Sequence, residues 1–393
     1  MNRTARSSIF AAITVAALVL AGCSSDTDTA TETSASAVEE TATESGTETA
    51  PADDAASECI ATSQAVVDKW TAEVPLIGPS QQIDMAANAD KEYWLLLTLV
   101  NQFSGAVADG FEEAAAQSGV KAVVWDGKGT VNEWNKGLNQ AVAQGADGII
   151  LWGIPPELVQ EGLQAAVDAG IPVIDSVNGS VDDPLQPGVL AHVDVNAYQW
   201  GEALASWMLV DSGCKANVGV VWPPAFGGLD KIANQTRDTL AERCPECKFV
   251  SAEMDVANLA TSLPEQTRTM LTANPDLNYF TPLFDSAVTF AAPVVSEFPG
   301  VQIGSHDGVP SSLDMVRAGG PQTMDMTYPP NEYLGWALMS IIAGLSQGLE
   351  VDQALLQIPE RMVTTETIPA TNEEIWPAYA DYAPAFLEAW GIN

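Results

Sequence analysis

Short apolar runs alternate with amphipathic helical segments along most of the chain, and this alternation constrains the fold more than any other feature. The first series predicts strands at 93–100, 121–126, 148–152 and 172–176, with helices at 105–118, 133–144 and 156–169. After a helix at 197–210, a second series predicts strands at 217–222, 248–254, 279–283 and 302–305, with helices at 229–243, 259–273, 287–298 and 312–318. Strands separated by helices form parallel sheets that are covered on both faces. We therefore predict an α/β fold with two Rossmann-like arrays in tandem, each about the size of one domain.

Ligands of open α/β sheets bind beyond the carboxyl ends of the strands, so we expect binding residues there. Those after the first series are Asn101, Phe103, Ser104, Asp126, Trp152, Asp175 and Asn178, and those after the second are Trp222, Phe226, Phe284, Asp285, His306 and Asp307. Carboxylates and amides hydrogen-bond hydroxyl groups, and aromatic rings stack on the C–H face of a sugar ring. The mixture predicts a site for a neutral polyhydroxylated solute. The alternatives are aromatic residues packed under loops and aspartates that cap turns.

The start of the chain has the pattern of an export signal. Arg3 and Arg6 precede an apolar run at 9–20, which closes on Leu20-Ala21-Gly22-Cys23. The run is shorter than the roughly 20 residues that cross a bilayer. It resembles the lipobox of bacterial lipoproteins, which implies diacylation of the Cys23 thiol and a lipid anchor on the extracytoplasmic face of the cell membrane. The alternative is an ordinary signal peptide in which Cys23 occurs by chance.

Residues 24–58 contain no aromatic, lysine or arginine residue and consist mainly of Ser, Thr, Ala, Asp and Glu. Such a segment cannot bury enough apolar surface to fold, so we predict a disordered acidic tether, with an acidic interaction tail as the alternative. The formal net charge of the chain is −37, which argues against a nucleic-acid partner. A helical extension is expected at 59–90, and no membrane span is expected after the signal.

Four cysteines follow Cys23, at positions 59, 214, 244 and 247. An even number of cysteines in an oxidising compartment indicates two disulfides, and three connectivities are open. We expect Cys214 to pair with Cys244 or Cys247. A redox role for Cys244 and Cys247 is less favoured, because the pair follows a predicted helix, whereas reactive cysteines normally lie at a helix N-terminus.

Several stretches, in order along the chain, resemble the type I periplasmic binding proteins of the sugar-binding group, which are the solute receptors of ABC importers. They are LVNQF (99–103), NQAVAQGADGII (139–150), AGIPVID (169–175), HVDVN (192–196), GSHDG (304–308) and YPP (328–330). The resemblance implies two domains joined by three hinge strands, the first with 91–196 and about 329–355, the second with 197–328 and about 356–393. It also implies a ligand in the cleft, closure on binding, and an ABC permease as partner.

The resemblance carries ligand-binding roles onto particular positions of this sequence. They are Asn101, Phe103, Asp175, Asn196, Phe284, Asp285 and Asp307. Many monosaccharide receptors have an arginine after the aspartate that matches Asp175, whereas this chain has Ser176. That departure, with the aromatic Trp152, Trp222 and Phe226, favours a polyol, a modified sugar or a less polar ring compound.

Enzymatic activity lacks a recognisable nucleophile and base. The chain has no Gly-x-Ser-x-Gly motif, and its two histidines are His192 and His306. We therefore expect no catalysis, no cofactor and no metal site. A sensor that presents its closed form to a membrane receptor is the alternative function, because no motif marks the surface that would face a partner. After a strand at 361–365, the aromatic residues of 372–393 predict a segment packed on the second domain.

Overall fold

The computed structural model describes residues 52–392. The predicted signal, the lipobox with Cys23 and residues 24–51 of the predicted acidic tether lie outside the described residues. Residues 52–58 are helical, as the first part of α1 (Ala52–Thr71), so the prediction of disorder is wrong for this end of the tether. Within 52–392, no helix is long and apolar enough to cross a membrane.

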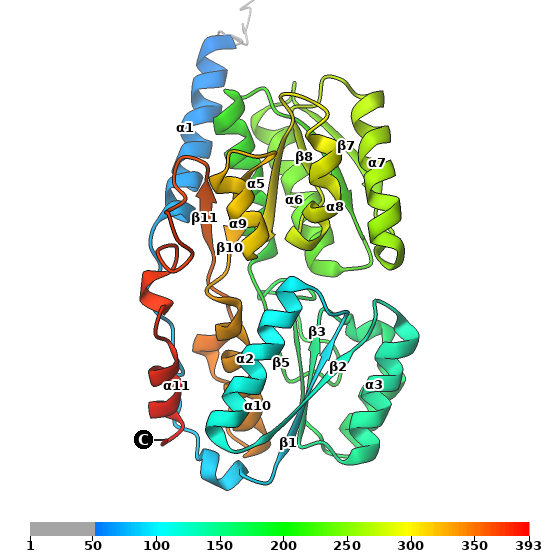
Figure 1. The fold of residues 1–393 in the computed structure, drawn as a ribbon, viewed down its shortest axis with the longest axis vertical. Helices are drawn as coiled ribbons and strands as arrows, with labels where there is room; N and C mark the ends of the chain where they lie inside the picture. Colours follow the sequence, from blue (N-terminus) through cyan, green and yellow to red (C-terminus); the bar gives the residue numbers. More distant parts are fainter. Residues whose placement is uncertain (1–51, 393) are drawn as a thin grey trace, which may run out of the picture. The chain divides into compact units, whose positions relative to one another are not determined.

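The first domain is built on a five-stranded parallel sheet (Figure 1). Its strands lie in the order β2-β1-β3-β4-β5. Their bounds are β1 (Glu92–Leu97), β2 (Lys121–Asp126), β3 (Gly148–Trp152), β4 (Val173–Ser176) and β5 (Ala191–Val193). In strand β1, which lies between β2 and β3, Leu97 pairs with Asp126 of β2 and with Trp152 of β3. The register thus brings the carboxyl ends of these three strands to one edge of the sheet.

Helices cover both faces of this sheet because successive side chains of a strand point to opposite faces. Tyr93 and Leu95 pack against α2 (Gln102–Ser118) and α10 (Asn331–Ser346). Trp94 and Leu96 pack on the other face, against α3 (Val131–Gln144) and α4 (Gln160–Asp168), which follows a short 3₁₀ turn. Each face therefore has its own apolar core.

The second domain has a six-stranded sheet in the order β11-β10-β9-β8-β6-β7. Its strands are β6 (Asn217–Trp222), β7 (Lys248–Glu253), β8 (Tyr279–Thr281), β9 (Gln302–Asp307), β10 (Gln322–Thr327) and β11 (Arg361–Thr364). All neighbours are parallel except β11, which is antiparallel to β10. Its helices are α5 (Ala197–Ser212), α6 (Gly227–Arg243), α7 (Leu259–Ala273), α8 (Asp285–Val295) and α9 (Pro310–Arg317). The predicted α/β fold with two mostly parallel sheets is confirmed.

Helices α2 and α10 approach each other through two glycines. A Cβ atom added at Gly110 would lie 2.0 Å from the carbonyl oxygen of Glu332. One added at Gly335 would lie 2.3 Å from the amide nitrogen of Phe111 and 2.3 Å from the carbonyl oxygen of Val107. Only glycine lets the two backbones come this close, and the N-terminus of α2 is thereby held against the first domain.

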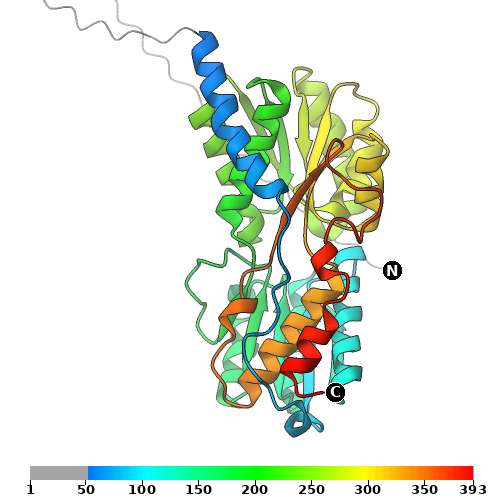
Figure 2. The same ribbon diagram turned by 90° about the vertical axis from the view of Figure 1, so that its left-hand side faces the viewer.

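Five segments within residues 52–392 pass between the domains. Three of them correspond to the implied hinge, at 194–196, 328–330 and 356–360, and an isolated bridge pairs Asp194 with Gln357. The other two are 72–91, which follows α1 (Ala52–Thr71), and 365–382, which follows β11. Figure 2 shows 72–91 descending from α1 to the first domain. The Tyr379 hydroxyl donates to the carbonyl oxygen of Pro75 (3.0 Å), so the two additional segments touch.

The C-terminal segment packs on the first domain, so the predicted packing on the second domain is wrong. Helix α11 (Ala383–Ala389) lies beside α10 (Figure 2), and the ring of Trp390 stacks on that of Trp336 with centroids 5.1 Å apart. Tyr333, Tyr379 and Phe386 complete the aromatic cluster. The aromatic spacing indicated burial correctly, but the apolar partner is α10.

The expected pairing of Cys214 is also wrong, because the structure joins Cys59 to Cys214 and Cys244 to Cys247. Helix α1 packs along α5, which brings Cys59 to the residue just beyond the end of α5, with Cα atoms 6.4 Å apart. Cys244 and Cys247 flank a turn after α6, where the N–H of Cys247 donates to the carbonyl oxygen of Cys244 (2.9 Å). The Sγ atom of Cys244 nevertheless lies 3.3 Å from the carbonyl oxygen of Cys214.

Candidate functional site

A cavity of about 670 Å³ opens between the two domains, at the carboxyl ends of strands from both sheets. This volume lies within the range of roughly 300–1,000 Å³ that is typical of small-molecule sites. Its principal lining residues are Thr98, Leu99, Val100, Asn101, Phe103, Ser104, Asp126, Lys128, Trp152, Val177, Phe226, Leu229, Val256, Asn258, Leu259, Thr261, Phe284, Ser286, Phe290, His306, Asp307 and Tyr328. Both domains therefore contribute to one site.

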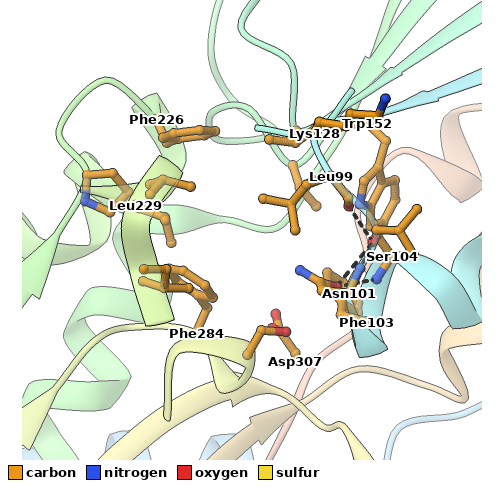
Figure 3. A pocket seen from close by; sticks show the side chains of 18 of the residues that line it. Leu99, Asn101, Phe103, Ser104, Lys128, Trp152, Phe226, Leu229, Phe284 and Asp307 are labelled. Carbon is orange, nitrogen blue, oxygen red and sulfur yellow. Dashed lines mark hydrogen bonds between the residues drawn. The ribbon is translucent and has the colours of Figure 1, made fainter. Parts of the chain in front are cut away.

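Asn101 is held at the cavity by the cap of α2. Its Oδ1 accepts from the N–H of Ser104 (2.9 Å), while the Ser104 hydroxyl accepts from the N–H of Asn101 (3.0 Å). This reciprocal capping box satisfies two of the orphan donors of the helix N-terminus and fixes the Asn101 rotamer. Figure 3 shows Asn101 at the cavity wall. Because the cap uses the oxygen, the Asn101 side chain presents its amide nitrogen as a hydrogen-bond donor.

An aromatic wall forms the first-domain side of the cavity. The ring of Phe103 lies 5.4 Å from that of Trp152 at a tilt of 60°, and 5.4 Å from that of Tyr328 in a stacked arrangement. The three residues come from α2, β3 and the hinge segment after β10. Phe103 and Trp152 were predicted, whereas Tyr328 was noted only for its resemblance to the family. Such a wall can stack on the apolar face of a ring.

Asp307 forms the floor on the second-domain side, and a carboxyl cluster of Asp307, Asp285 and Asp325 extends behind it. Asp307 ends β9 and is 3% exposed. Burial and the adjacent charge of Asp285 raise the pKa of Asp307 well above its usual range. Burial also raises the pKa of Asp285, to about 6. Behind them, the side-chain amide of Gln322 donates to Asp285 (3.2 Å) and to Asp325 (2.8 Å). A protonated carboxyl has one O–H donor and keeps acceptor capacity, so Asp307 with its raised pKa can donate a hydrogen bond as well as accept one.

His306 lies next to this cluster as a neutral imidazole. Its Nδ1 contacts the carbonyl oxygen of Leu283, and its ring lies 4.8 Å from that of Trp200. Burial lowers the pKa of His306 to about 3. Uncharged at neutral pH, it adds no positive charge to the cavity.

Asp126 and Lys128 occupy the rim at the end of β2. Asp126 Oδ1 accepts from the N–H of Val100 (3.2 Å) and from that of Lys128 (2.9 Å). These two bonds order the loops after β1 and β2, and they leave the second carboxylate oxygen of Asp126 without a hydrogen-bond partner among the described residues. The rim thus offers one acceptor and one ammonium group.

Backbone strain is concentrated at the cavity. Among residues 52–392, five non-glycine residues have positive φ, and three of them line the cavity: Lys128 (51°), Val177 (54°) and Asp307 (119°). Each such conformation costs of order 1–3 kcal/mol and persists where the surrounding structure enforces it. Strain of this kind is typical of functional sites.

Residues 93–350 match the family model described as a periplasmic binding protein domain. The chain belongs to the periplasmic binding protein family.

Several solved structures are similar to this binding protein. A 5-methylthioribose transporter solute binding protein from Thermotoga lettingae has a TM-score of 0.66 and 17% identity, over 79% of this chain and 98% of that one. A solute binding protein from Agrobacterium vitis with bound allitol has a TM-score of 0.63 and 18% identity, over 72% of this chain and 97% of that one. An ABC sugar transporter subunit from Rhodobacter sphaeroides has a TM-score of 0.62 and 21% identity, over 70% of this chain and 98% of that one. A search of curated proteins finds no match.

Nine of the predicted residues line the cavity of the binding protein. They are Asn101, Phe103, Ser104, Asp126, Trp152, Phe226, Phe284, His306 and Asp307. Ser104 acts mainly as part of the α2 cap, since its hydroxyl also donates to the carbonyl oxygen of Leu99 (2.8 Å).

Asp175 does not line the cavity, although it ends β4 as predicted. Its carboxylate contacts Nδ1 of His192 on the neighbouring β5 (2.7 Å), and Nε2 of His192 lies 3.2 Å from Asp194. Burial alone would lower the pKa of His192, but the hydrogen bond to Asp175 and the nearby carboxylates raise it above its usual value. Asp175 is thus engaged within the first domain near the hinge.

Four further predicted residues lie outside the lining because other partners hold them. The side-chain amide of Asn178 donates to the carbonyl oxygen of Ile154 (3.0 Å). Asn196 caps α5, and its amide donates to Asp182 (2.7 Å). Trp222 donates from Nε1 to Asp230 (3.1 Å), and Asp285 accepts from the N–H of Val309 (3.0 Å). No group of three or more possible metal ligands occurs among residues 52–392.

Several lining residues were not predicted as ligand contacts. They are mostly aliphatic or aromatic: Leu99, Val177, Leu229, Val256, Leu259, Phe290 and Tyr328. In the sequence these residues look like core residues. Of the seven, only Leu99 and Tyr328 had a sequence signal for the site, because they lie in stretches that resemble the family.

Proposed function

We propose that this binding protein is an extracytoplasmic solute receptor that takes a sugar, polyol or modified sugar into the cavity and delivers it to an ABC importer. The observation that carries the proposal is the lining: amide and carboxylate groups from both domains face one cavity that an aromatic wall flanks. The solved structures similar to it include proteins with bound allitol and D-allose. The family membership supports an extracytoplasmic location.

Each polar group of the lining has a defined role in this proposal. The amide nitrogen of Asn101 donates to a ligand hydroxyl, Asp126 accepts from one, and Asp307 exchanges hydrogen bonds with another from the opposite domain. Phe103 and Trp152 stack on the ring or carbon chain. Hydrogen bonds to charged groups contribute about 1.5–3 kcal/mol each, so a few of them and one stacked ring suffice for micromolar affinity, about −8 kcal/mol.

Binding is coupled to closure of the domains. A ligand that contacts both walls stabilises the arrangement in which they are close, and it does so by the difference in its affinity for the closed and open forms. The closed form presents a surface that combines both domains, and this is the surface that we assign to recognition by the permease. We assign no catalytic step to the protein, because both of its histidines are held by structural contacts.

The proposed membrane attachment is a lipid on Cys23. It is supported by the lipobox pattern at 20–23 and by the long acidic segment that follows it. The anchor would keep the receptor near its permease.

The test compares two asparagine caps of the same kind. Asn101 and Asn196 each cap a helix and accept a hydrogen bond from the N–H three residues on, at 2.9 and 3.1 Å, but only Asn101 lines the cavity. Each change to alanine should cost about 1 kcal/mol of stability. A panel of sugars and polyols is first screened by thermal shift on the purified protein, and affinity is then measured by calorimetry.

We expect Asn101→Ala to weaken binding about three- to tenfold, the loss of one hydrogen bond, while Asn196→Ala keeps wild-type affinity. Equal affinity of the two variants would remove Asn101 from the site. A panel in which no sugar or polyol shifts the melting temperature would overturn the ligand class.

A further inference from the structure

Away from the floor at Asp307, the second-domain side of the cavity is mainly apolar. Six side chains form this wall, and we call them the apolar face. They come from α6 and α8 with their N-cap residues, from the 3₁₀ turn before α7 and from the first residue of α7: Phe226, Leu229, Val256, Leu259, Phe284 and Phe290. All six are half-buried, so each retains exposed apolar surface. Figure 3 shows Phe226, Leu229 and Phe284 across the cavity from Leu99, Asn101 and Trp152.

The polar residues beside the apolar face have little to offer a hydroxylated ligand. The side-chain amide of Asn258 donates to Asp255 (2.8 Å), and the Thr261 hydroxyl donates to the carbonyl oxygen of Asn258 (3.0 Å). The hydroxyl of Ser286 is the remaining group, buried without a hydrogen-bond partner in the described part of the chain. A sugar with hydroxyls on every side would leave several of them without partners against this wall, which costs binding free energy.

The ionisable side chains of the cavity are at its other walls. Asp126 and Lys128 lie at the first-domain rim, and Asp307 lies at the floor. Among residues 52–392, no arginine lines the cavity. Ser176 stands where many monosaccharide receptors have an arginine, and its hydroxyl donates to the carbonyl oxygen of Val193 (2.6 Å). The cavity is therefore amphipathic: its polar groups lie at the first-domain rim, at Asn101 beside the aromatic wall and at the floor, and the wall opposite them on the second domain is mainly apolar.

We infer that the ligand is a sugar or polyol that carries an apolar substituent, such as an alkyl, aryl or thioether group, and that the apolar face holds this substituent. The inference rests on the proposed function and names its ligand class more closely. The hydroxylated part meets Asn101 and Asp307, and the substituent displaces water from the apolar face. Removal of apolar surface from water makes the substituted ligand the tighter one.

The test uses matched ligand pairs on the purified protein. Glucose, galactose, arabinose and ribose are each supplied as the methyl glycoside and as the phenyl glycoside, with phenol alone as a further probe. Isothermal calorimetry measures the affinities. For at least one sugar, the phenyl glycoside should bind about tenfold or more tightly than the methyl glycoside, and phenol alone should bind more weakly than either.

A pair of leucine variants locates the gain. Leu229→Asn places an amide in the apolar face, and Leu387→Asn makes the same change at a half-buried helical leucine that packs on the first-domain core away from the cavity. Leu229→Asn should remove most of the preference for the phenyl glycoside and leave the methyl glycoside within about threefold of wild type. Leu387→Asn should preserve the preference.

The outcomes separate the two proposals. If methyl and phenyl glycosides bind equally, or if Leu229→Asn keeps the full preference, the inference is wrong while the receptor function stands. If no glycoside binds, or if phenol binds as tightly as its glycosides, the sugar contributes nothing, and the polyhydroxylated ligand class fails together with the inference.

Discussion

Replacement of Gly110 by alanine should destabilise the first domain, because α2 and α10 touch at that position. The added Cβ would lie 2.0 Å from the carbonyl oxygen of Glu332, whereas carbon and oxygen atoms in contact normally lie about 3.3 Å or more apart. The obstructing atom is backbone, so no side-chain rotation relieves the overlap. The helices must separate by more than about 1 Å, which loosens the packing along their whole contact.

The magnitude follows from two opposing terms. Alanine in a helix interior is favoured over glycine by about 1 kcal/mol. Overpacking of a close contact costs about 1–3 kcal/mol, and more when backbone atoms must move. With a cost at the upper end, about 3 kcal/mol, the net loss is about 2 kcal/mol, which lowers the melting temperature by about 4–8 °C at about 2–4 °C per kcal/mol. Gly335→Ala, whose Cβ would meet α2 at 2.3 Å, should behave alike.

The assay is thermal and denaturant unfolding of both variants beside Gly105→Ala. Gly105 lies in the same helix, and a Cβ there meets nothing within 4 Å, so its replacement should raise stability by up to about 1 kcal/mol. Ligand affinity is a second readout, because α2 carries Asn101 and Phe103 into the cavity. If Gly110→Ala is as stable as Gly105→Ala, the close crossing of α2 and α10 does not exist.

Two further predictions concern stability. Serine replacement of Cys59 and Cys214, which are 155 residues apart, should lower the free energy of unfolding by about 5 kcal/mol, because the disulfide restricts a long loop of the unfolded chain. The same replacement of Cys244 and Cys247, which are three residues apart, should lower it by about 1.6 kcal/mol. Equal losses in denaturant titrations would contradict this. The pKa of His306 is lowered to about 3 by burial, so the unfolded chain takes up its proton near pH 6.5 and the folded protein does not. As the pH drops below 6.5, the free energy of unfolding of the wild type should therefore decrease by up to about 1.4 kcal/mol per pH unit relative to that of His306→Gln. Unfolding curves at pH 7, 6 and 5 measure this difference, and parallel pH profiles of the two proteins would refute it.

The sequence predicts the regular elements of the fold well where apolar runs are bounded by turns. The observed bounds of β2, β3, β6 and α7 equal the predicted ones. Strand β10 has no such signal, because Gln322 and Asp325 are buried polar residues that serve the carboxyl cluster. Helix α10 was also not predicted, since it is buried on nearly all sides and lacks an amphipathic stripe.

The candidate site could be predicted only as far as the strand-end rule reaches. The rule places Asp126 and Asp307 at the cavity, since their strands end there. It also selects Asp175, whose carboxylate is taken by His192 of the next strand, a contact that depends on strand order and register. The apolar face could not be predicted, because Leu229 and Phe290 look like core residues until the fold shows that they border a cavity.

The disulfide between Cys59 and Cys214 decides where a mechanical load enters the molecule. The chain reaches the described structure through α1, which packs on α5, and the covalent link carries any pull on the N-terminus into the end of α5. A pull on the N-terminus is thus transmitted into the second domain, and it does not pass through β1, α2 or the first-domain wall of the cavity. Whatever holds this chain from its N-terminal side thus holds the second domain, and the closure that we propose would move the first domain relative to it.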